Sequence, residues 1–156
     1  MTMLRTTILL LVLFVTVPAW AGPAADADLE ILRDTIRANR KALVAASLTL
    51  TDAEAKDFWP LYDKYQGEIK AVNDRLVKVI QDYTGGYKSL TDEQAKKLAE
   101  DYLAVEEDRA KVRRTYFGDF TKVLPGKKAA RFYQIENKMD AVIRYDLASE
   151  IPVVEQ

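Results

Sequence analysis

Twice in this chain the same phrase opens a long amphipathic segment: LTDAEAKDF at residues 50–58 and LTDEQAKKL at residues 90–98. In each copy a threonine is followed three residues later by Glu or Gln. This spacing is typical of a capping box, in which the threonine side chain and the Glu or Gln side chain each accept a hydrogen bond from a backbone amide of the first turn. We interpret the repeated residues first as helix-capping groups and apolar staples: Leu50, Thr51 and Glu54 in one copy, and Leu90, Thr91 and Gln94 in the other.

Apolar residues at steps of three and four predict four helices. Gly85 and Gly86 end the second helix shortly before the third begins, so these two long helices are expected to be antiparallel. Pro60 lies beyond the first turn and is expected to kink the second helix or to start it afresh. We predict an all-α fold, an elongated and curved antiparallel helical hairpin with two shorter flanking helices. The expected helices cover residues 28–47, 51–83, 91–123 and 127–149.

The N-terminus has the features of an export signal. Arg5 precedes an apolar run at residues 8–17, and Ala19-Trp20-Ala21 fits the small-x-small cleavage rule. The run is too short to span a membrane, which takes about 20 apolar residues. We therefore predict that residues 1–21 are a cleaved signal peptide and that residues 22–156 form one helical domain, located in the periplasm and without a membrane span.

The repeat and the export signal together carry a family resemblance. Leu-Thr-x-x-Gln at residues 90–94 and Leu-Thr-x-x-Glu at residues 50–54 resemble the LTxxQ motif of the Spy/CpxP-like periplasmic proteins. This resemblance implies an ATP-independent chaperone or an envelope-stress sensor. Some members of that superfamily bind metals through His, Cys or Met. Here the chain after the signal retains only Met139, so transition-metal sensing is not expected.

The composition argues against catalysis and against nucleic-acid binding. The chain has no His and no Cys, which excludes His-based acid–base chemistry, Cys nucleophiles and the usual zinc sites. Without Arg5 of the signal, the 23 basic residues fall to 22 against 24 acidic ones, a net charge of about -2. That balance is not typical of a nucleic-acid binder. We expect a protein that is not an enzyme and that has no cofactor and no metal.

Two sets of residues are candidates for contact with a partner. Trp59 and Phe117 lie beside the apolar stripes of their helices and are expected to be exposed apolar contacts. Six cationic residues flank the break at Leu124-Pro125-Gly126, and antiparallel packing is expected to gather them into one patch; ordinary solvation is the alternative interpretation. The six residues are Lys111, Arg113, Arg114, Lys127, Lys128 and Arg131.

These features lead to three functional expectations. The first is a chaperone-like protein that binds unfolded or partly folded polypeptides without ATP. The second is a regulatory protein that docks on one specific envelope protein, such as the periplasmic part of a sensor. The third is a structural helical module with no independent activity. A thin sheet of helices cannot bury both of its faces, so a homodimer is also expected.

Overall fold

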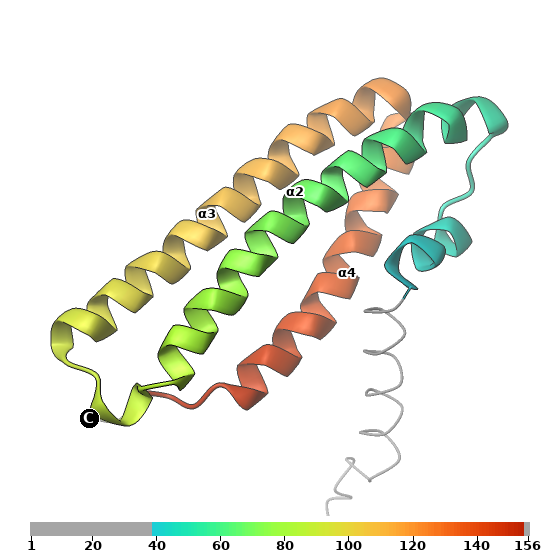
Figure 1. Cartoon of the computed structure of the whole chain (residues 1–156). Coiled ribbons are helices and arrows are strands. Elements are labelled where there is room, and N and C mark those ends of the chain that lie inside the picture. Colours follow the sequence, from blue (N-terminus) through green and yellow to red (C-terminus); the bar gives the residue numbers. More distant parts are fainter. Residues whose placement is uncertain (1–38, 155–156) are drawn as a thin grey trace, which may run out of the picture.

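The computed structural model describes residues 39–154, and they form an all-α fold as predicted. Three long helices dominate it: α2 at Asp52–Thr84, α3 at Asp92–Val123 and α4 at Gly126–Glu150 (Figure 1). A shorter helical segment covers residues 39–47, and one 3-10 turn, η1 at Tyr87–Ser89, lies between α2 and α3. The proposed signal peptide and the first part of the first expected helix lie outside the described residues. No helix within residues 39–154 is long and apolar enough to cross a membrane.

Both long helices of the hairpin begin at a capping box. The Thr51 hydroxyl accepts from the Glu54 amide at 3.3 Å, and the Glu54 carboxylate accepts from the Thr51 amide at 2.8 Å. The second copy repeats this geometry, with 3.3 Å and 2.9 Å for the corresponding bonds between Thr91 and Gln94. Each box satisfies amides that have no partner within the helix. The repeated phrase therefore sets the starting points of α2 and α3.

Helix α2 continues through Pro60 without a break. The alternative that the helix starts afresh at this proline is wrong. Proline has no amide proton, so the carbonyl of Lys56 loses its usual helical donor. Lys56 and Pro60 are both exposed, and water can satisfy that carbonyl. The helix can therefore pass this residue at moderate cost.

The main core lies at the end of the bundle where α3 turns into α4. Phe58 of α2, Phe120 of α3 and Phe132 of α4 meet there, with ring centroids 4.4–5.4 Å apart. The helical segment 39–47 adds Val44, and Leu48 follows it into the same cluster. Burial of these large apolar side chains is the chief source of stability in a chain without cysteine.

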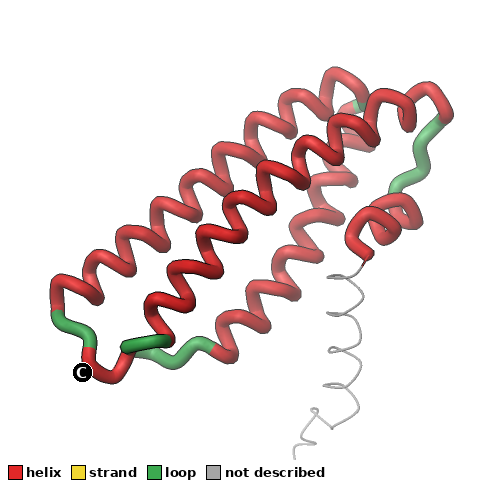
Figure 2. The backbone as a smooth tube through the Cα atoms, in the orientation of Figure 1, coloured by secondary structure: helices red, strands yellow, loops and turns green. Residues whose placement is uncertain are grey.

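The other end of the bundle is more thinly packed. The backbones of α2 and α3 stay close along their length, whereas α4 approaches α3 mainly near Pro125 (Figures 1 and 2). A separate small cluster of Val72, Leu76 and Val105 is buried in this half. Tyr102 was expected on the buried stripe of α3 but is 42% exposed. Arg144 of α4 reaches its side chain but leaves much of the ring exposed.

Candidate functional site

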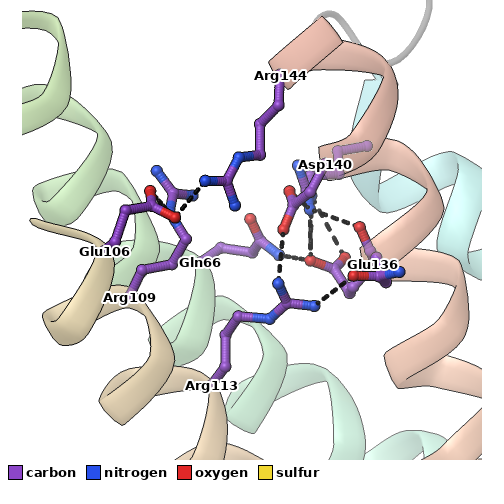
Figure 3. A network of polar contacts seen from close by, with 9 residues as sticks. Gln66, Glu106, Arg109, Arg113, Glu136, Asp140 and Arg144 are labelled. Atoms are coloured by element: carbon purple, nitrogen blue, oxygen red, sulfur yellow. Dashed lines mark hydrogen bonds and ion pairs between the residues drawn. The ribbon is translucent and has the colours of Figure 1, made fainter. Parts of the chain in front are cut away.

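A polar network crosses the middle of the bundle and joins all of its long elements. Arg40, from the helical segment 39–47, donates through Nη2 to Glu136 Oε2 at 2.7 Å and to Asp140 Oδ1 at 2.6 Å. Gln66 of α2 donates to the same Glu136 oxygen at 3.2 Å (Figure 3). Arg113 of α3 lies 3.6 Å from Asp140 Oδ2. The network thus ties the short helical segment, α2 and α3 to two carboxylates of α4.

Glu136 is the deepest charge of this network, with only 1% of its surface exposed. Burial raises the pKa of this carboxyl above its ordinary value, although the hydrogen bond and charge of Arg40 act in the opposite direction. An isolated buried carboxylate would be very costly, and the bidentate contact with Arg40 offsets that cost. We interpret this part of the network as structural, because it holds α4 to the rest of the bundle.

The outer side of the network opens into a groove between α3 and α4. There the Arg113 guanidinium lies over the ring of Tyr133, 4.7 Å from its centroid, in a cation–π contact. Phe117 packs edge-to-face against the same ring at 5.7 Å. Both rings remain substantially exposed, at 38% for Phe117 and 40% for Tyr133. This end of the groove is therefore aromatic and accessible.

The other end of the groove is formed by charged residues of both helices. Arg144 of α4 donates to Glu106 Oε2 of α3, and Arg109 Nε lies 3.5 Å from Glu106 Oε1 (Figure 3). Burial acts to lower the pKa of Arg144, but its interactions with Glu106 and Tyr102 together outweigh burial and the net shift is upward. Arg144 is therefore positively charged at all ordinary pH values.

We call this hollow the arginine groove, and its volume is about 400 Å³. Four arginines and one glutamate line it, which leaves an excess of three positive charges on the lining. The neighbouring Arg40, Glu136 and Asp140 reduce the excess to two. The residues of the arginine groove are Glu106, Arg109, Ala110, Arg113, Arg114, Phe117, Tyr133 and Arg144.

The six cationic candidates do not form one patch. Arg113 and Arg114 line the arginine groove, whereas Lys111 lines a different hollow between α2 and α3. Residues two apart on a helix do not face each other, so Lys111 lies toward α2 while Arg113 lies toward Asp140 of α4. The single-patch expectation is wrong for this reason.

The cations after the break are also distributed over different contacts. Lys128 bonds Glu54 at 2.5 Å, and Arg131 donates to the carbonyl of Ser47 at 2.9 Å. Lys127 is exposed to solvent. Lys128 and Arg131 thus connect the start of α4 to neighbouring elements, a structural use that does not preclude contact with a partner.

The two aromatic candidates have different surroundings. Phe117 is exposed and lies in the arginine groove, as described above. Trp59 is only partly exposed: it packs edge-to-face against Phe58 at 4.9 Å and against Tyr62 at 5.5 Å, and Lys41 lies over its ring. Its position identifies it mainly as an outer part of the core.

Several residues of this region were not among the sequence candidates. The spacing of Phe132, Glu136 and Met139 places Glu136 on the apolar face of α4, which is a visible signal of a buried carboxylate. Arg109 was noted only as a charge within an apolar seam, and the structure confirms its place there, at 5% exposure. Nothing in the local sequence of Arg40 indicates its distant partners.

The described residues contain no group of three or more Asp, Glu, His or Cys side chains arranged to hold a metal ion. The three consecutive acidic residues of α3 diverge, because Glu106 pairs with Arg144 and Asp108 pairs with Arg75 of α2, while Glu107 is exposed. Comparison with known proteins found no match among family models, curated sequences or solved structures. The site must therefore be interpreted from its own chemistry.

Proposed function

We propose that this chain is an exported, ATP-independent protein-binding protein of the chaperone type, which engages unfolded or partly folded polypeptides in the periplasm. The observation that carries the proposal is the arginine groove, where guanidinium groups lie beside exposed aromatic rings. Apolar surface rimmed by polar groups is typical of protein-binding sites. The resemblance to the Spy/CpxP-like proteins and the N-terminal export signal favour the same function.

The length of the groove suits a polypeptide segment. Its α3 wall runs from Glu106 to Phe117, and at 1.5 Å per helical residue this is roughly 17 Å. An extended chain rises about 3.3 Å per residue, so roughly five residues fit along it. The mixed lining offers apolar contact and charge without a deep, enclosed pocket. Such a surface favours segments of varied sequence that expose both apolar and polar groups.

The first experiment measures aggregation of a chemically denatured model protein with and without the purified chain, residues 22–156, in the absence of nucleotide. We expect suppression at near-stoichiometric ratio that weakens as salt is raised, because salt screens the arginine charges. Replacing Phe117 and Tyr133 together by Ala is expected to reduce suppression several-fold. No suppression at any salt concentration would contradict the chaperone proposal.

The matched control for that experiment is Tyr145→Ala. Tyr145 is an exposed aromatic residue of α4, at 66% exposure, and it does not line the arginine groove. The control variant should suppress aggregation as the parent chain does. Equal losses in both variants would mean that exposed aromatic area in general, rather than this groove, is responsible.

A regulator that docks on one envelope protein is the second candidate. It is favoured by the preformed geometry of the groove, in which Arg113 is already held against Tyr133 and Arg144 against Glu106. A site organised in advance loses little conformational entropy when one matching segment binds. Capture of one periplasmic protein in tight stoichiometric complex, without general suppression of aggregation, would favour this candidate.

We further propose that two copies associate through the thinly packed half of the bundle. Leu103 is 58% exposed there, and Tyr102 is exposed as well. Association would bury this apolar surface. Sedimentation velocity at micromolar concentration is expected to show a dimer, and a monomer alone would argue against the proposal.

A further inference from the structure

The arginine groove contains a buried cation whose hydrogen-bonding groups are only partly used. Arg109 is 95% buried, yet its Nε makes no hydrogen bond to any described residue. The nearest carboxylate oxygen, Glu106 Oε1, lies 3.5 Å away and is itself without a hydrogen-bond donor. A buried donor without an acceptor is unfavourable. The Nε–H of Arg109 is therefore a donor that the described residues leave unused.

A second guanidinium nearby is in a similar state. The Nε of Arg113 is buried and has no hydrogen-bond partner within residues 39–154, although its terminal nitrogens face Asn137 and Asp140. Arg144 and Arg114 complete the cationic lining, and the only carboxylate on it is already engaged with Arg144. The planar guanidinium group matches the geometry of a carboxylate, which can accept two parallel bonds from one such group.

The two aromatic rings indicate what kind of group carries the oxyanion. Phe117 and Tyr133 border the cations and are exposed, so a group bound at the arginines would have apolar surface beside it. A small free anion would leave these rings uncovered. A polypeptide that places an acidic side chain next to an apolar or aromatic one would contact both the arginines and the rings.

We infer that the arginine groove is a carboxylate-binding site, which selects polypeptide segments carrying Asp or Glu beside an apolar or aromatic residue. The carboxylate accepts hydrogen bonds from Arg109 and Arg113, and the neighbouring side chain covers Phe117 and Tyr133. This inference rests on the proposed function, since it names the feature of the polypeptide that is recognised.

The test uses a labelled peptide with one Glu between two Phe residues, the same peptide with Gln, and the purified exported protein. We expect fluorescence anisotropy to show about tenfold tighter binding of the Glu peptide than of the Gln peptide. A tenfold difference in affinity is about what one pair of charge-assisted hydrogen bonds typically contributes. Arg109→Gln should abolish most of this preference. Equal affinity for the Glu and Gln peptides would overturn the inference.

Arg109 is buried, so its variant could fail to fold, and a second pair keeps the test decisive. Arg114→Gln removes an exposed charge from the groove, and Lys111→Gln removes one that lines a different hollow, between α2 and α3. Arg114→Gln should weaken the Glu peptide several-fold with little effect on the Gln peptide, and Lys111→Gln should change neither. Equal effects of the two variants would show that only overall charge matters, which contradicts a built site.

Inorganic phosphate and acetate serve as competitors, because a free anion would recognise the same arginines. Displacement of the Glu peptide only at salt-like concentrations supports a polypeptide ligand. Tight binding of free phosphate would assign the site to a small oxyanion and overturn the polypeptide assignment.

Suppression of aggregation without a Glu preference would leave the proposed function standing and refute this inference alone. A Glu preference without suppression would support the carboxylate site and point to one acidic partner.

Discussion

The hydroxyl of Tyr62 is buried in the main core and has no hydrogen-bond partner among the described residues. The side chain is 2% exposed, and burial raises the pKa of its phenol well above the ordinary value. Tyr62→Phe removes this polar group and keeps the ring contacts with Phe58 and Phe132. We expect the free energy of unfolding in urea to rise by about 1 kcal/mol.

Tyr145→Phe is the control for Tyr62→Phe, because the hydroxyl it removes is on an exposed residue and its loss should change stability very little. A loss of stability in Tyr62→Phe would mean that the buried hydroxyl has a hydrogen-bond partner after all.

Glu136 gives the bundle a pH dependence whose sign follows from its environment. Because burial raises the pKa of this carboxyl, the folded state holds the proton more readily than the unfolded chain. Its contribution to stability is therefore complete below the ordinary pKa and is lost as pH rises through the raised one. Glu136→Gln removes the titrating group with little change of shape, so comparing it with the parent isolates this effect.

We expect the stability of the parent relative to Glu136→Gln to fall as pH is raised from about 4 to about 7. Urea unfolding at a series of pH values measures the difference directly, and Glu107→Gln, at an exposed position, is the control variant. A relative gain for the parent over this range would show that Arg40 lowers the pKa more than burial raises it.

At the scale of the element, the capping boxes explain where α2 and α3 begin. Thr91→Ala removes the acceptor for the Gln94 amide and should lower the free energy of unfolding by about 1 kcal/mol. Peptide binding at the arginine groove should be unchanged once the variant is folded, because the α3 residues that line the groove lie well after Thr91. Thr115→Ala, in the middle of the same helix, is the control and should not destabilise. Lost binding in a folded Thr91→Ala protein would give the motif a direct functional role.

At the scale of the whole molecule, stability is expected to be uneven along the hairpin. The main core contains eleven buried residues, whereas the second cluster contains three. Local opening is easiest where few apolar contacts are lost. Hydrogen exchange should therefore be slowest near Phe58–Ile69 and Phe120–Phe132 and faster near the loop at Gly85. Equal protection along both helices would show that the bundle opens only as one cooperative unit.

The all-α class and the start and end of each long helix could be predicted because they depend on local chemistry. Capping boxes, a pair of glycines and a Leu-Pro-Gly break act over a few residues, and apolar spacing marks the faces that must be buried. The seam position of Arg109 and the exposure of Phe117 follow from the same periodicity. These features need no knowledge of how the helices are arranged.

The candidate site depended on the tertiary structure, for two physical reasons. The way in which α4 packs beside α3 decides which side chains of α3 are covered, so it leaves much of Tyr102 exposed and the groove open beside Arg109. The partners of Arg40 lie 96 and 100 residues away, and no local pattern encodes contacts of that separation. The sequence by itself determined the helices and their faces, whereas packing alone decided which cations share a surface and which are used to hold the bundle together.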